Sequence, residues 1–440
     1  MFSVRKNLNA RNFIYILPIF FLLILFFFPF HYLKNNLVFL KDLNFYDLIC
    51  INIITQFTLY LLLSFFFSNI SQLLLGIFSL SFILLFFFGV KNYYKIRNNI
   101  FLLLSVFLFF IIVICNFVTI AYSVRLEWDA IAHWYWKVQN FYQGGKLENF
   151  KNLPYPFYPH LGTYLWSNLL RISYLDYEYF GRLYYAFVYI VSIFSITYSI
   201  NKNYFILVTC VVSFLIFDLF ALGGYQEFLV FFFVAFISKL FFLLSEKKIS
   251  NNFFIIFFLL ISNLLIWTKQ EGIIYAFIFY FISITVLKFK LRKILFLSFS
   301  LFLLMFIYFY LNNLLKNSGF FHEPIVNDFK KFKDLYLFFE TFIYISFNLI
   351  ISLIQRPVIL LSIPLYFMLK YKQKENFFKL NFINLFFILN IFLVYGVFFH
   401  TGYPLELVVP HVLDRLLLQT SGFYLIVFIY YFNFISKNEK

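Results

Sequence analysis

The sequence predicts an all-α polytopic membrane protein with about twelve or thirteen transmembrane helices and a large first external loop. Of its 440 residues, 63% are hydrophobic and only 12% are charged, and the mean hydropathy is +0.87. Continuous apolar runs such as 100–120 and 294–311 are long enough to cross the hydrocarbon core of a bilayer as helices. Because lipid offers no partners to the backbone, these runs must be helical, and they lack the alternation typical of barrel strands.

The apolar segments occur along the whole chain, which we treat as one transmembrane domain, 1–440. Helices are expected near 13–30, 47–67, 72–90, 100–122, 183–200, 204–220, 226–244, 253–268, 272–287, 294–312, 380–399 and 417–435, with one crossing within 342–369. The first run has no small-residue cleavage site after it, so we expect a retained helix. Two stretches, 123–182 and 313–338, are too polar for lipid and are predicted to form external loops.

Basic residues in four short loops predict the orientation. They are Lys91, Lys95, Arg97, Lys247, Lys248, Lys288, Lys290, Arg292, Lys293, Lys370, Lys372, Lys374 and Lys379. If these loops and the C-terminus face the cytoplasm, helix parity puts 123–182, 221–225, 269–272, 313–338 and 400–416 on the outer face. Orientation therefore explains the formal charge of +16 better than a nucleic-acid-binding patch does, and no nucleic-acid partner is expected.

The first external loop opens with RLEWDAIAHWYWK at 125–137, directly after an apolar run. On a helix, Asp129 and His133 share one face, so Asp129, with Glu127 and Lys137 nearby, stands in an aromatic surface at the membrane exit. One interpretation is that Asp129 only caps an interfacial helix, with tryptophans as anchors. The other is a carboxylate at headgroup level that acts as a general base, with His133 and Lys137 in contact with substrate. We expect all five tryptophans, at 128, 134, 136, 166 and 267, to lie at this boundary.

Further along the same loop, the prolines of KNLPYPFYPHLGTYLW at 151–166 exclude a helix before His160, whereas 160–171 can form a short amphipathic helix that lies flat. This segment is either a shaped part of a site, with His160 in contact with substrate, or a structural turn.

Charged residues also mark the outer ends of three later helices. Glu227 follows ALGGYQ at 221–226, and Lys269 and Glu271 lie in WTKQEG at 267–272. Charges at this depth are usually functional or paired. Lys269 is therefore either a phosphate ligand or the partner of Glu271 in a snorkelling pair at a helix hairpin.

The segment HVLDR at 411–415 opens the last helix and holds the third such group. Arg415 has a guanidinium suited to bidentate phosphate binding, with His411 and Asp414 beside it. The alternative is a salt bridge from Arg415 to Asp414 or to a neighbouring helix. Histidines show no metal-ligand spacing, so a metal could be held only by carboxylates, and we expect neither a metal nor a cofactor.

Five motifs, in order, resemble the GT-C superfamily of integral membrane glycosyltransferases, which includes protein O-mannosyltransferases and lipid A aminoarabinose transferases. They are WDAIAHWYWK at 128–137, YPHL at 158–161, GYQEF at 224–228, TKQEG at 268–272 and LDRLLLQ at 413–419. Three or four helices precede Asp129 here, whereas better-known members have one, and no large soluble C-terminal domain follows.

The resemblance implies a glycosyltransferase that moves a sugar from a polyprenyl-phosphate donor to a lipid, glycan or protein acceptor. It implies an essential carboxylate, Asp129 or its nearest substitute Glu127, in the first external loop. Lys269 and Arg415 would bind phosphate, and Glu227 or Glu271 would position sugar hydroxyls. We expect a bacterial plasma-membrane protein whose site faces the periplasm and contacts membrane lipids.

Two other functions are compatible with the sequence. A transporter or flippase of a lipid-linked glycan would favour internal repeats and polar sites near the bilayer midplane, and the polar residues here gather at one face. A glycan polymerase or ligase would favour arginines in a long late external loop, and 313–338 has lysines and no arginine. A glycosyltransferase of the GT-C type is the preferred interpretation.

Overall fold

The computed structural model describes residues 40–74, 99–122, 125–172, 178–200, 202–215, 221–287, 289–316, 330–372, 377–402 and 404–438, with a few single residues between 31 and 76. These segments form helices and connecting loops, and no β-strand occurs among them. Nine of the described helices are long and apolar enough to cross a membrane. The predicted all-α polytopic membrane fold is confirmed.

The long helices correspond closely to the predicted apolar runs. They are α3 (Phe45–Ser64), α5 (Ile100–Tyr122), α8 (Tyr179–Thr197), α10 (Glu227–Ser245), α11 (Asn251–Thr268), α13 (Leu291–Lys316), α15 (Leu335–Gln355), α17 (Phe377–His400) and α18 (Leu405–Asn438). Three apolar helices are shorter: α9 (Lys202–Leu215), α12 (Glu271–Val286) and α16 (Pro357–Lys372). The predicted helix 13–30 and most of the predicted helix 72–90 lie outside the described residues.

Short helices fill the loops between these spans. They are the π-helix η2 (Ala130–Tyr135), α6 (Trp136–Tyr142), the 3₁₀-helices η3 (Leu147–Asn152) and η4 (Ala221–Gly223), α7 (Leu161–Ile172) and α14 (Lys330–Lys333). Within the predicted crossing 342–369, one long helix ends at Gln355 and Pro357 begins the next. Proline suits this position because the first residue of a helix needs no N–H partner.

Local signals in the sequence start several of these helices. The Asn44 side chain accepts a hydrogen bond from the Asp47 N–H, and the Asp47 carboxylate accepts one from the Asn44 N–H, which forms a capping box before α3. The Ser250 hydroxyl caps α11 and the Asp334 carboxylate caps α15. These caps satisfy N–H groups that the helix itself leaves without partners.

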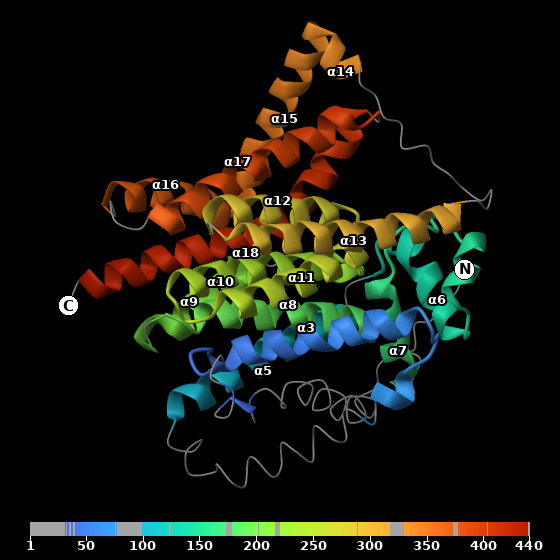
Figure 1. Ribbon diagram of the computed structural model, residues 1–440, viewed down its shortest axis with the longest axis horizontal. Helices are drawn as coiled ribbons and strands as arrows, with labels where there is room; N and C mark the ends of the chain where they lie inside the picture. Colours follow the sequence, from blue (N-terminus) through green and yellow to red (C-terminus); the bar gives the residue numbers. More distant parts are fainter. Residues whose placement is uncertain are drawn as a thin grey trace.

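Most of the long helices lie side by side, whereas α15 is steeply inclined to them. Helices α6 and α7 gather at one end of the bundle and the C-terminus lies at the other (Figure 1). Two helices form its centre, since the most apolar windows of α8 and α10 are 100% and 94% buried. The windows of α13 and α15 are only 22% and 17% buried. Large apolar side chains on α13, such as Phe299 and Phe302, are each 67% exposed, as a lipid-facing surface requires.

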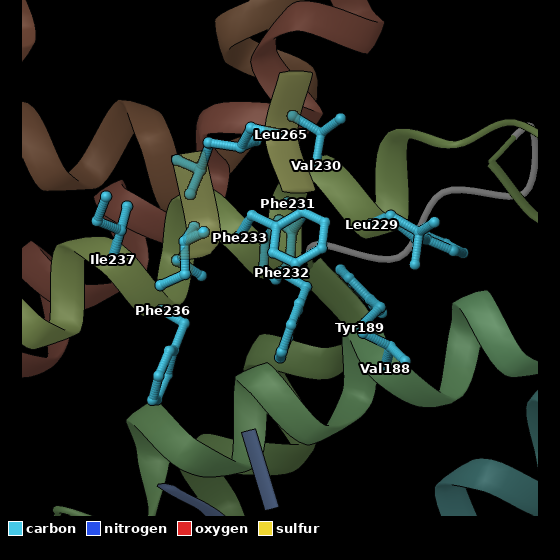
Figure 2. Close-up of a cluster of buried hydrophobic side chains, with 14 of the residues drawn as sticks. Val188, Tyr189, Leu229, Val230, Phe231, Phe232, Phe233, Phe236, Ile237 and Leu265 are labelled. Atoms are coloured by element: carbon cyan, nitrogen blue, oxygen red, sulfur yellow. The ribbon is translucent and has the colours of Figure 1, made fainter. Parts of the chain in front are cut away.

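The core surrounds α10, whose phenylalanines and aliphatic residues pack against α8, α11 and α18. Figure 2 shows Val188 and Tyr189 of α8 and Leu265 of α11 around this helix. Helices α10 and α18 approach closely at Gly422, where an added Cβ would lie 2.5 Å from the Ala235 Cβ. Small residues at such contacts allow van der Waals packing between helices in a membrane.

The structure shows how the first external loop, 123–182, is packed. The short helix expected at 160–171 is present as α7, and both its faces are buried against α3, α6, α8 and α11. Among the tryptophans, only Trp128 and Trp136 are exposed as interfacial anchors would be, at 65% and 52%. Trp134, Trp166 and Trp267 are buried. The loop is therefore a packed cap on the bundle, held by its aromatic core.

Candidate functional site

Five charged residues from four separate segments meet at the end of the bundle that carries α6 and α7. Glu227 Oε1 accepts hydrogen bonds from Lys269 Nζ at 2.8 Å and from Arg415 Nε at 2.6 Å. Lys269 Nζ also lies 2.9 Å from Glu271 Oε1, and Arg415 Nη1 donates to Asp129 Oδ2. We call these five residues, Asp129, Glu227, Lys269, Glu271 and Arg415, the charged cluster.

Asp129 immediately precedes the π-helix η2, at the position of a helix cap. Its side chain makes no capping hydrogen bond and is directed instead to Arg415 of α18. The interpretation of Asp129 as a mere cap is therefore not supported. π-Helical turns are uncommon and often occur at functional sites. His133, four residues on, has its Nε2 atom 3.8 Å from Asp129 Oδ1.

The second carboxylate of this segment, Glu127, lies next to the loop 221–225. Its backbone N–H donates to the Gly223 carbonyl at 3.0 Å. A Cβ added at Gly223 would lie 2.3 Å from the Glu127 Cγ, so a larger residue there would displace the Glu127 side chain. The Glu127 carboxylate is partly exposed and makes no hydrogen bond or ion pair within the described part of the chain. It remains open to an incoming group.

Tyr225, which the sequence interpretation did not single out, supports Arg415 from the same loop. The guanidinium carbon lies 4.4 Å from the centre of the Tyr225 ring, within cation–π range. Burial raises the pKa of the Tyr225 phenol to about 12, with a further contribution from the Asp129 carboxylate. The phenol is therefore neutral at physiological pH, and the ring acts as a platform for the cation.

The charged cluster has a buried half and an accessible half. The side chains of Glu227 and Lys269 are 1% and 8% exposed, whereas those of Asp129 and Arg415 are each 20% exposed. Three carboxylates face two cations, so an anionic ligand cannot simply add to the cluster. It can bind a cation here only by replacing a carboxylate. Glu271 is 23% exposed, but its cation, Lys269, is buried, so the Asp129–Arg415 pair is the one in which both partners are accessible.

Of the two predicted phosphate partners, only Arg415 has an accessible ion pair. The Lys269 ammonium lies between two carboxylates. It forms the predicted ion pair with Glu271 and a second ion pair with Glu227. Arg415 likewise forms a salt bridge to neighbouring segments, as the second interpretation of this residue foresaw. Its partners are Asp129 and Glu227, not Asp414.

Two predicted substrate-binding residues lie within the packed loop instead of the cluster. Lys137 is fully buried, donates to the Tyr158 carbonyl at 2.7 Å and lies over aromatic rings including Phe150. Burial holds the Lys137 pKa well below its usual value. His160 Nε2 lies 2.8 Å from the Ser64 hydroxyl, and burial, with a smaller effect of Lys137, lowers its pKa to about 3.

The remaining predicted residues, on α18, are near Arg415 in sequence but outside its contacts. His411 is exposed, one turn before Arg415. Asp414 is half-buried, and its Oδ1 atom has no hydrogen-bond partner in the described part of the chain. Within that same part, no group of three or more His, Cys, Asp or Glu side chains is arranged to hold a metal ion.

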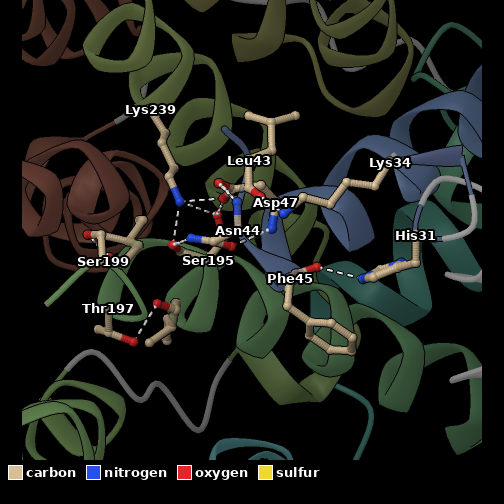
Figure 3. A network of polar contacts seen from close by, with 12 residues as sticks. His31, Lys34, Leu43, Asn44, Phe45, Asp47, Ser195, Thr197, Ser199 and Lys239 are labelled. Atoms are coloured by element: carbon tan, nitrogen blue, oxygen red, sulfur yellow. Dashed lines mark hydrogen bonds and ion pairs between the residues drawn. The ribbon is translucent and has the colours of Figure 1, made fainter. Parts of the chain in front are cut away.

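A second charged network, also missed from the sequence, lies further along α10 from Glu227 and is shown in Figure 3. The Lys239 ammonium of α10 pairs with Asp47 of α3 and donates to the Ser195 carbonyl of α8. The Ser195 hydroxyl donates to Asp47 Oδ1 at 2.7 Å. We call Asp47, Ser195 and Lys239 the Asp47–Lys239 network. Charges inside the apolar runs 47–67 and 226–244 were the available signal.

The two charged groups differ in what they offer a ligand. Side chains of the Asp47–Lys239 network are buried and paired with one another, whereas the charged cluster has an accessible ion pair beside the unpaired Glu127. The charged cluster is therefore the candidate site. Comparison with protein-family models, with curated proteins and with solved structures gives no match. The chemistry of this cluster is thus the basis on which a function is assigned.

Proposed function

We propose that this membrane protein is a glycosyltransferase of the GT-C type that transfers a sugar from a polyprenyl-phosphate donor to a lipid, glycan or protein acceptor. The observation that supports it most is the position of Arg415, which bridges a buried carboxylate, Glu227, and an accessible one, Asp129. A phosphate and a general base are the two groups that this reaction must place side by side.

The donor phosphate takes the place of Asp129 at Arg415. A guanidinium binds phosphate through a planar fork of donors, and Glu227 and Tyr225 hold this guanidinium in place. The Glu227 contact is buried and persists, whereas the Asp129 contact is partly exposed and exchanges. Donor binding thereby releases the Asp129 carboxylate beside the reacting centre.

The released Asp129 then acts as the base. The acceptor oxygen attacks the anomeric carbon, and its proton passes to the Asp129 carboxylate. The bond from the anomeric carbon to the phosphate oxygen breaks, and its electron pair leaves with the lipid phosphate, whose charge Arg415 stabilises. Glu127, partly exposed and two residues away, is the substitute for this role.

Charge distribution supports a site on the outer face. Helix α10 runs from Glu227 in the cluster to Ser245, and Lys247 and Lys248 follow at its other end. Its 19 residues span about 28 Å, close to the thickness of a hydrocarbon core. Since basic loops favour the cytoplasmic side, the cluster faces outward, which in a bacterial plasma membrane is the periplasm.

Sugar transfer by the purified protein tests this proposal. Labelled polyprenyl-phosphate monosaccharides are offered with total membrane acceptors, and wild type is compared with Asp129→Asn. We expect the variant to lose about 10²- to 10⁴-fold in rate, the usual contribution of a general base. Glu178→Gln is the matched control, because Glu178 also pairs with an arginine, Arg182, at 3.0 Å, outside the cluster.

The outcomes separate the parts of the proposal. Transfer that survives in Asp129→Asn would reject this residue as the base, and an equal loss in Glu178→Gln would indicate a general structural effect. If wild type transfers no sugar and binds no polyprenyl phosphate, the protein is not a glycosyltransferase of this kind. Sugar-lipid binding with passage across vesicles but without transfer would instead identify the transporter or flippase.

A further inference from the structure

Beneath the charged cluster lies a layer of buried polar atoms that the ion pairs do not use. Both amide atoms of Gln419, the hydroxyl of Tyr275 and the Oε2 atom of Glu227 have no hydrogen-bond partner within the described residues. The three residues are each 0% exposed. We call Gln419, Tyr275 and Glu227 Oε2 the polar floor.

Gln419 and Tyr275 lie one helical turn deeper in the bundle than the charges. Gln419 follows Arg415 by four residues on α18, and Tyr275 follows Glu271 by four on α12, so each shares a helix face with a member of the cluster. The Tyr275 phenol interacts electrostatically with both Glu271 and Glu227. The polar floor is therefore continuous with the cluster through Glu227, which belongs to both.

Unpaired polar atoms at this depth need a partner. Each buried donor or acceptor without one destabilises the protein, and lipid supplies no substitute. A ligand for the polar floor must both donate and accept, because an amide and a phenol do both while a carboxylate oxygen only accepts. Sugar hydroxyls have this character. A phosphate lacks donors for Glu227 Oε2 and carries the wrong charge.

We infer that the polar floor binds the sugar ring of the donor, and that it selects neutral sugars over uronic acids. This inference rests on the proposed function and deepens it. A sugar hydroxyl donates to Glu227 Oε2, while Gln419 and Tyr275 bind neighbouring hydroxyls. A sugar carboxylate in this layer would lie against the buried Glu227 carboxylate and be repelled.

Entry to the polar floor is coupled to the exchange at Arg415. Arg415 lies one turn nearer the end of the bundle than Gln419, and its guanidinium pairs there with Asp129. When the donor phosphate replaces Asp129, the sugar attached to it follows into the layer below. Phosphate and sugar therefore bind at successive depths along α18.

Binding of two lipids to the full-length protein in detergent tests this inference. The first is polyprenyl phosphate, and the second is the same lipid carrying a neutral hexose. We expect wild type to prefer the hexose lipid, and Gln419→Met and Tyr275→Phe each to reduce that preference about tenfold. A tenfold change corresponds to roughly 1.4 kcal/mol, the value of one net hydrogen bond. Affinity for the bare phosphate lipid, which reports folding, stays at the wild-type value in both.

Gln226→Met provides the matched control. Gln226 is as buried as Gln419 and equally unpartnered, and although it directly precedes Glu227, its side chain lies against Gly162 and near Tyr185. We expect this variant to keep the full preference for the hexose lipid. A third lipid that carries a uronic acid should bind wild type no better than the bare phosphate lipid does.

The possible results have distinct meanings. If the preference is absent in wild type, survives both substitutions, or extends to the uronic acid lipid, the inference is wrong and the polar floor holds water only. If the bare phosphate lipid binds with equal affinity to wild type and Arg415→Gln, the phosphate site itself is wrong. That outcome contradicts the proposed function, whereas the others leave it intact.

Discussion

Replacing Glu227 by glutamine should destabilise the protein far more than replacing Asp129 by asparagine. The Glu227 carboxylate is 1% exposed and binds both cations of the charged cluster. Removing one member of a buried ion pair costs roughly 3–5 kcal/mol. Because Lys269 keeps Glu271 at 2.9 Å and Arg415 keeps Asp129, we expect a loss near the lower limit, about 3 kcal/mol.

The same reasoning gives a much smaller cost for Asp129→Asn. Asp129 and Arg415 are each 20% exposed, so water screens their attraction, and Arg415 retains Glu227. We expect a loss of about 0.5–1 kcal/mol. Reversible unfolding by SDS in mixed micelles, followed by tryptophan fluorescence, measures both free energies, with Glu178→Gln as a third variant. Equal costs for Glu227→Gln and Asp129→Asn would refute the division of the cluster into a structural and an exchangeable half.

Two further predictions concern groups outside the cluster. In the Asp47–Lys239 network, we expect Asp47→Leu to cost more than Lys239→Met, because Asp47 without Lys239 keeps hydrogen bonds from Ser195 and the Asn44 N–H. The double substitution should cost less than Asp47→Leu alone, measured by the same unfolding; a strictly additive double variant would contradict this. For His160, whose pKa of about 3 lies below its ordinary 6.5, the unfolded chain takes up the proton first as the pH falls. Stability should therefore decrease by about 1.4 kcal/mol for each pH unit between about 6.5 and 3, and His160→Gln should remove this part of the acid slope.

Much of the fold could be predicted from the sequence, because lipid restricts the backbone conformations that can cross a membrane. A continuous apolar run in a membrane must be a helix, and the basic loops sort the helix ends into two groups. These rules are sufficient to put Glu227, Lys269, Glu271 and Arg415 at one end. The same rules do not identify which charged residues form ion pairs. Asp129 and Arg415 are 286 positions apart in the sequence, and Glu227 and Lys269 are 42 apart.

The details that sequence reasoning missed depend on which helices are neighbours. Helices in a membrane are apolar on all sides, so no stripe reveals the face that contacts another helix. Helix α8 is fully buried and α15 is mostly exposed, although both read as apolar runs. In the first loop, the burial of Lys137 could not be predicted from the sequence either. A lysine there is expected at the surface, yet aromatic residues enclose it completely.

The two charged groups together hold α10 at two levels. Glu227 fixes its N-terminal end to α11 and α18, and Lys239, about 18 Å further along the helix axis, fixes it to α3 and α8. With Glu227 fixed in this way, a ligand that displaces Asp129 from Arg415 need not move the helix beneath. In the proposed exchange, the segment that moves is the one in which Asp129 directly precedes a π-helix. Under that proposal, the separation of a fixed carboxylate from a displaceable one would allow the same arginine to support the fold and to bind a phosphate.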